Sequence, residues 1–223
     1  MELQLPIIIV VVVAIIGFAI VHYWMECVRR EKMRAMASQL GLAYVCDKDG
    51  DFDGRHNEFG CLREGHSRYA RHIVQGSWQG RRVTLFDYHY TTGSGKHQQH
   101  HRLSCVLVNS QVPLRPLLIR PEHFGDKMAA FFGAEDINFE SAEFSRRFYV
   151  KSSDRRWAYD VLHAQTIEFL LGTTAEFHIQ FGSGSAMAWR EHCLEPEGFL
   201  AGLQVIAGVL DRLPDYVVKQ QLS

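Results

Sequence analysis

The chain has 223 residues, with 24 Lys and Arg side chains against 25 Asp and Glu. This length predicts one domain or two small ones, and the charge balance argues against a generally basic nucleic-acid-binding protein and an acidic disordered tail. Apolar residues make up 47% of the chain, too many for a disordered protein. The five cysteines are odd in number and form no C-x-x-C pair, which disfavours a disulfide framework or a Cys-rich zinc site.

An apolar segment near the N-terminus gives the strongest signal in the sequence. Between residues 5 and 24 only Pro6, Gly17 and His22 lie outside the apolar set, and no formal charge interrupts the segment. As a helix it would be about 30 Å long, the thickness of a bilayer core. A cleaved signal peptide is the alternative, but it needs a basic start and a small-residue cleavage site, which this segment lacks. The segment therefore predicts a retained transmembrane anchor.

Aromatic and basic residues follow the predicted anchor. The residues that flank the membrane are Tyr23, Trp24, Arg29, Arg30, Lys32 and Arg34. The two aromatic side chains suit the membrane interface, and the four basic ones have no counterpart on the N-terminal flank. The positive-inside rule then places the N-terminus outside and the C-terminal domain in the cytoplasm, where unpaired cysteines are stable. We expect a single-pass protein of the cell membrane that is embedded in the lipid bilayer.

The chain divides into three predicted parts. Residues 1–25 form the anchor, residues 26–41 a juxtamembrane helix that Gly41 ends, and residues 42–223 a cytoplasmic α+β domain. The acidic stretch 134–143 marks the point where this domain would split into two subdomains. No Pro- or Ser-rich linker divides it elsewhere.

The pattern of apolar residues predicts the elements of the domain. Strands are expected at 71–77, 81–90, 103–109, 117–119, 148–151, 176–181 and 186–190. Helices are expected from Pro121 to Gly133, over 154–171 after a cap at Ser153, and over 196–213 before Pro214. Strands do not alternate regularly with helices, so a doubly wound sheet is disfavoured. The order predicts an α+β fold in which helices pack on one face of a mostly antiparallel sheet.

Histidines are concentrated in one part of the domain. Seven of the twelve lie between His56 and His101. A loop predicted at 92–101 carries His97, His100 and His101, which would bind a transition metal if the loop folded over them. They would also respond to pH, and the alternative is that they are solvated hairpin residues without a role. The sequence supplies no fixed partners for such a site, and no cofactor is expected.

Catalytic and nucleic-acid motifs give little support to other functions. There is no G-x-S-x-G motif, so an enzyme would need distant residues to meet in one pocket. The set considered for this is Asp87, His89, His178 and His192. Basic residues and aromatics occur together around Tyr88, but the aromatics alternate with polar residues as in a sheet, so no nucleic-acid partner is expected.

Three segments of the domain carry a resemblance to known proteins: residues 85–96, the run 118–122 and the run 144–150. With them, the chain resembles bacterial single-pass membrane proteins that contain a domain of unknown function. The resemblance covers roughly residues 40–200. It implies no known activity and no catalytic residues.

Three hypotheses for the function follow from the sequence. The leading one is a non-catalytic, membrane-tethered module that binds a protein partner or associates with itself. The first alternative is a metal- or pH-responsive module that uses the histidine-rich loop 97–101. The second is a membrane-anchored enzyme.

Overall fold

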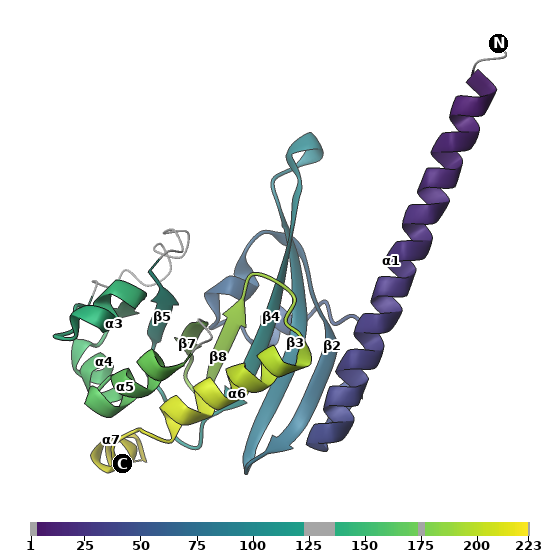
Figure 1. Cartoon of the computed structure of the whole chain (residues 1–223). Coiled ribbons are helices and arrows are strands. Elements are labelled where there is room, and N and C mark those ends of the chain that lie inside the picture. The colour runs from purple at the N-terminus through teal and green to yellow at the C-terminus, as the bar shows by residue number, and fades with distance from the viewer. Residues whose placement is uncertain (1–3, 123–136, 174–176, 223) are drawn as a thin grey trace.

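A computed structural model describes residues 4–122, 137–173 and 177–222. These residues form an α+β fold, as predicted: a long N-terminal helix and an eight-stranded sheet with helices packed on it (Figure 1). The strand order is β1-β2-β3-β4-β8-β7-β5-β6, and every described pairing is antiparallel.

The elements have the following bounds. The strands are β1 (Ala43–Val45), β2 (His66–Trp78), β3 (Arg81–Thr92), β4 (Gln99–Asn109), β5 (Leu117–Pro121), β6 (Phe148–Ser152), β7 (His178–Phe181) and β8 (Ser185–Arg190). The α-helices are α1 (Gln4–Leu40), α2 (Phe52–Arg55), α3 (Ala142–Arg147), α4 (Arg155–Val161), α5 (Ala164–Gly172), α6 (Pro196–Leu210) and α7 (Asp215–Leu222). Two short 3-10 helices are η1 (Gly60–Arg63) and η2 (Gly95–His97).

Helix α1 is continuous from the apolar segment into the domain. Its N-terminal half extends away from the sheet, and its C-terminal half packs beside β2 (Figure 1). Phe18 is 75% exposed, whereas Met33 and Met36 are buried against the sheet. Among the described residues α1 is the one helix long and apolar enough to cross a bilayer. One helix therefore has two surroundings, an apolar exposed half and a packed half.

The sheet has a core on each face because alternate residues point to opposite sides. On one face, Val83 and Leu85 pack with α6 and the packed half of α1. On the other, Phe86 and Tyr88 pack with the segment 52–63, which contains α2 and η1. The expectation that helices cover one face only was therefore wrong, because this short segment supplies Phe52 and neighbouring apolar residues to the second face.

Several predicted boundaries also differ from the structure. Pro121 ends β5 instead of starting a helix, and the rest of that predicted helix, to residue 133, lies outside the described residues. The predicted helix 154–171 is two helices, since Leu162 leaves the helical conformation. Asp154 caps the first of them by accepting a hydrogen bond from the backbone N–H of Trp157 at 3.0 Å, a role predicted for Ser153.

A buried histidine lies in the second core. His178 is 4% exposed, and its ring stacks on Trp189 with 5.0 Å between centroids. Burial, with smaller contributions from Arg120 and Arg190, lowers the pKa of His178 to about 4. The folded protein therefore holds a neutral imidazole here under mildly acidic conditions.

This histidine predicts a loss of stability in acid. Between pH 6.5 and about pH 4 the unfolded chain binds a proton at His178 while the folded chain does not, so stability falls as the pH falls. At the lower end of this pH window the free energy of unfolding is about 3 kcal/mol smaller than at pH 6.5 and above. The free energy of unfolding can be measured with urea on the full-length protein in detergent at several pH values. Between pH 6.5 and pH 4 it should fall by about 3 kcal/mol less in His178→Gln than in the wild-type protein. Parallel curves for the two proteins would contradict the prediction.

Candidate functional site

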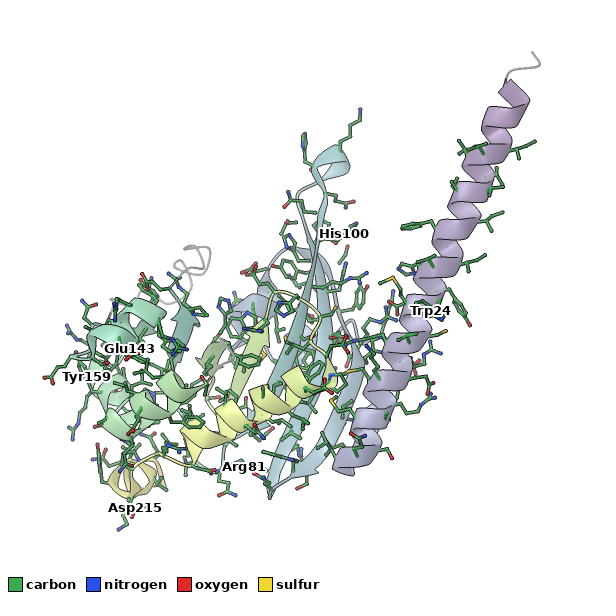
Figure 2. The ribbon with its side chains drawn as sticks, in the orientation of Figure 1. Trp24, Arg81, His100, Glu143, Tyr159 and Asp215 are labelled. Atoms are coloured by element: carbon green, nitrogen blue, oxygen red, sulfur yellow. The ribbon has the colours of Figure 1, made fainter. Side chains whose placement is uncertain are left out.

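A polar pocket lies where α1 meets the sheet, and we name it the helix–sheet pocket. Its volume is about 280 Å³. It is bounded by residues 24–32 of α1, by β2, β3 and β4, and by the segment that precedes α6. Side chains that line it include Trp24, Glu26, Arg29, Arg71, Asp87 and Arg102. Figure 2 places Trp24 on α1 beyond the level where the helix packs on the sheet.

The pocket exists because one face of the sheet changes from apolar to polar along its strands. In β3, Val83 and Leu85 are followed on the same face by Asp87 and His89. Strand β4 changes at the same level, since Ser104 pairs directly with Asp87. Apolar side chains of α1 cannot pack tightly on this part of the sheet, so the interface is made by charged groups instead.

Arg29 and Asp87 form the central contact of this interface. The Nε and Nη2 atoms of Arg29 donate to the two carboxylate oxygens of Asp87 at 2.9 and 2.7 Å, a bidentate pair. Ser104 donates to the same carboxylate at 2.7 Å and accepts from the backbone N–H of Leu194 at 2.9 Å. The backbone carbonyl of Leu194 accepts from Arg29 in turn. This network joins α1, β3, β4 and the start of α6.

The pair is largely removed from water. The side chains of Arg29 and Asp87 are 14% and 10% exposed. Burial lowers the pKa of Arg29, but the Asp87 carboxylate more than offsets this, so the pKa lies above its ordinary value. Each charge is therefore stable in the interface only because the other is present.

A second polar cluster lines the same pocket. An Arg71 Nη atom lies 2.5 Å from the Glu26 carboxylate without hydrogen-bond geometry. The same carboxylate lies 3.6 Å from Nε2 of His72, too far for a hydrogen bond. The other ring nitrogen of His72 hydrogen-bonds the hydroxyl of Tyr44 at 2.8 Å. These contacts tie β2 to α1 and β1.

A β-bulge brings two consecutive residues of β2 to this pocket. The register with β3 shifts between Arg71 and Val74, and His72 has a φ of 52°. In a regular strand neighbouring side chains point to opposite faces, so Arg71 and His72 would be separated. The extra residue and the left-handed backbone allow both side chains to line the pocket. Such strained positions are found preferentially at functional sites.

The ionisable groups of the pocket are tuned by burial. Burial, and then the charge of Arg71, lowers the pKa of His72, and burial followed by His100 lowers that of His89. Burial, and then Asp87, raises the pKa of the Cys193 thiol. Both imidazoles are therefore neutral at pH 7 and the thiol is protonated. This chemistry suits binding of a polar group better than nucleophilic attack.

The residues considered for an enzyme do not meet in this pocket. Asp87 and His89 line it, but His178 stacks on Trp189 in the core of the opposite face of the sheet. His192 is exposed and is not one of the residues that line the pocket.

The histidine-rich hairpin has a different arrangement from a metal site. His100 hydrogen-bonds Thr91 at 3.2 Å, and His101 hydrogen-bonds Thr92 at 2.7 Å and stacks on Tyr90. As neighbours in β4, the two histidines point to opposite faces. His97 lies in η2 at the tip. Within the described ranges, no three His, Cys, Asp or Glu side chains are arranged to hold a metal ion.

The predicted membrane-flanking residues have contacts that the sequence did not indicate. Tyr23 and Trp24 are exposed, at 72% and 65%. Lys32 pairs with Glu195 at 2.8 Å, so this cation, like Arg29, docks α1 to the domain. In the same helix, Arg30 is exposed, and Arg34 pairs with Glu31.

The sequence contained one signal for the helix–sheet pocket, namely the change from apolar to polar residues within β3 and β4.

Fold and pocket together define a class of protein. It has an α+β domain on a single long N-terminal helix that is apolar enough to cross a membrane, with a polar pocket at their junction.

Comparison with known proteins supports the fold. No family model and no curated protein matches the chain, so the resemblance to proteins with a domain of unknown function has no such support. A solved structure, that of the mycobacterial trehalose monomycolate transport factor A, TtfA, is similar with a TM-score of 0.62. The match covers 83% of this chain and 96% of that chain at 13% identity. At this identity the likeness shows the fold alone.

Removing one partner of the central ion pair should destabilise the protein. We expect Asp87→Leu to cost about 3–5 kcal/mol because Arg29 remains buried without its partner. The double variant Arg29→Met/Asp87→Leu should cost less than the single one, since no unpaired charge remains. Unfolding of the full-length protein in detergent measures both.

An exposed pair of the same helix serves as the control. Arg34 and Glu31 are 56% and 68% exposed, so Arg34→Met should change stability by about 0.5 kcal/mol or less. A double variant less stable than Asp87→Leu would contradict the account of the pair.

Proposed function

We propose that this protein is a single-pass membrane protein whose C-terminal domain is a non-catalytic tethered module. Its N-terminus lies outside and residues 42–223 lie in the cytoplasm, where the domain binds a protein partner or associates with other copies.

The observation that carries this proposal is the rigid junction between anchor and domain. Helix α1 passes from its exposed apolar half into the domain without a break, and Arg29 and Lys32 hold it to β3 and to Glu195. A flexible linker would leave the domain free to rotate under the membrane. The rigid junction instead presents the same surface of the domain to any neighbour in the membrane.

The structural neighbour adds support of a general kind. TtfA is named as a trehalose monomycolate transport factor, and its structure is similar to this fold. We propose a comparable accessory role here, in a process at the membrane whose substrate the fold does not specify.

The orientation can be tested by fusions at the C-terminus of the chain. We expect green fluorescent protein at this position to be fluorescent and periplasmic alkaline phosphatase to be inactive, because the positive-inside rule places residue 223 in the cytoplasm. The opposite result for both fusions would overturn the orientation.

The tethered-module proposal predicts association that depends on the junction. The full-length protein, purified in mild detergent after cross-linking in the membrane, should carry a partner or further copies of itself. We expect at least a fivefold reduction in this association for Asp87→Leu, which removes the central contact that fixes the orientation of the domain on α1. Quantitative mass spectrometry and the mass of the complex measure it.

A matched control keeps the result specific. Arg82 is exposed at the start of β3, far along the strand from Asp87, so Arg82→Gln should leave the association unchanged. A monomeric wild-type preparation with no enriched protein would contradict the proposal.

A further inference from the structure

We propose that the helix–sheet pocket binds the phosphate group of an anionic glycerophospholipid from the adjacent membrane leaflet. The inference rests on the proposed membrane anchoring, because the anchor sets the pocket beside the bilayer. Four features of the pocket support it: its position, its unpartnered polar atoms, its charge and its size.

The pocket lies where the apolar segment of α1 ends. Trp24 and Met25 belong to its wall, and both are among the exposed apolar residues of the helix. Figure 2 shows His100, near the end of the β3–β4 hairpin, on the same side of the domain as this end of α1. With Trp24 at the membrane interface, the pocket opens at the depth of lipid headgroups.

Several buried polar atoms of the pocket lack hydrogen-bond partners. Among the described residues these are three nitrogens, Nε of Arg71, Nε2 of His72 and Nδ1 of His89, and the Oε2 atom of Glu26, which lies against the Arg71 guanidinium. His72 is 2% exposed, and the strained bulge fixes it against the pocket. Buried polar atoms are normally satisfied, so such a cluster in one pocket indicates a polar ligand. An oxygen-rich anion accepts from the Arg71 guanidinium and from an imidazole nitrogen that carries the ring proton.

The pocket has one more basic side chain than it has carboxylates. The three carboxylates are each paired: Glu26 with Arg71, Asp87 with Arg29 and Glu195 with Lys32. Arg102 is exposed at the rim and, among the described residues, contacts the Cys193 thiol rather than a carboxylate. Its guanidinium has the planar set of donors that binds phosphate in two places.

The size of the pocket limits what enters it. A volume of about 280 Å³ holds a headgroup but not the acyl chains of a lipid. Trp24 and Val28 line the side toward α1, where the glycerol and the first methylenes would lie. The chains stay in the bilayer while the phosphate reaches Arg102 and Arg71.

The test uses the full-length protein in dodecyl maltoside, with phosphatidylglycerol or phosphatidylcholine as the probe. Native mass spectrometry counts bound lipid. We expect phosphatidylglycerol to bind in preference to phosphatidylcholine, with at least a fivefold loss of occupancy in Arg102→Gln. Arg82→Gln removes the same charge at the far end of the sheet and should keep wild-type occupancy. Equal occupancy of phosphatidylglycerol in all three proteins, or equal binding of both lipids, would overturn the proposal.

Alkylation of Cys193 locates the bound lipid. This thiol is exposed and lines the pocket, so phosphatidylglycerol should slow its reaction with N-ethylmaleimide several-fold, as read from the labelled peptide. The ratio of rates with and without lipid is compared within each variant, because Arg102 itself contacts the thiol. Protection by inorganic phosphate but not by phosphatidylglycerol would overturn the lipid as the source of the phosphate.

The two proposals fail in different ways. A protein that alkaline carbonate releases from membranes lacks the anchor, and the tethered-module proposal then fails first. A protein that stays in the membrane but does not distinguish the two lipids contradicts the lipid pocket alone.

Discussion

The pairing of Arg29 with Asp87 is the contact on which the arrangement of this protein depends. A charge on a helix and a charge on a strand are each costly to bury, and each becomes stable only opposite the other. The bidentate geometry fixes both the rotation of α1 about its axis and its position along the sheet. Met33 and Met36, one and two turns further along, then pack on the apolar part of the same face.

The pocket is a consequence of the same change of polarity. Toward the start of β3 the sheet presents Val83 and Leu85, which share one apolar core with Met33 and Met36 of α1. Further along β3 and β4, beyond Asp87, the strands present His89 and Arg102, which line the pocket. The bulge at His72 adds a further donor at this level. Docking and binding therefore use neighbouring rows of one sheet face.

Local patterns in the sequence were sufficient for much of the fold. Alternation predicted β3 and β4 to within a few residues, and the uncharged run predicted the apolar half of α1. The site was not predicted, because the partners of Arg29 and Glu26 are 58 and 45 or more positions away and nothing local specifies them. The break at Leu162 was missed for a similar reason: the surrounding residues favour a helix, and tertiary packing decides otherwise.

A rigid junction is more than tethering requires. A flexible segment after the apolar helix would hold the domain at the membrane equally well, without burying Arg29 and Asp87. What the rigid junction adds is a fixed height and a fixed orientation of the domain. A pocket can bind lipid headgroups only if it lies at their depth in the leaflet. A partner in the membrane can bind only the surface of the domain that faces it. An apolar pair of similar size would stabilise the junction as well, but without the bidentate geometry of Arg29 and Asp87 it would fix the rotation of α1 less specifically.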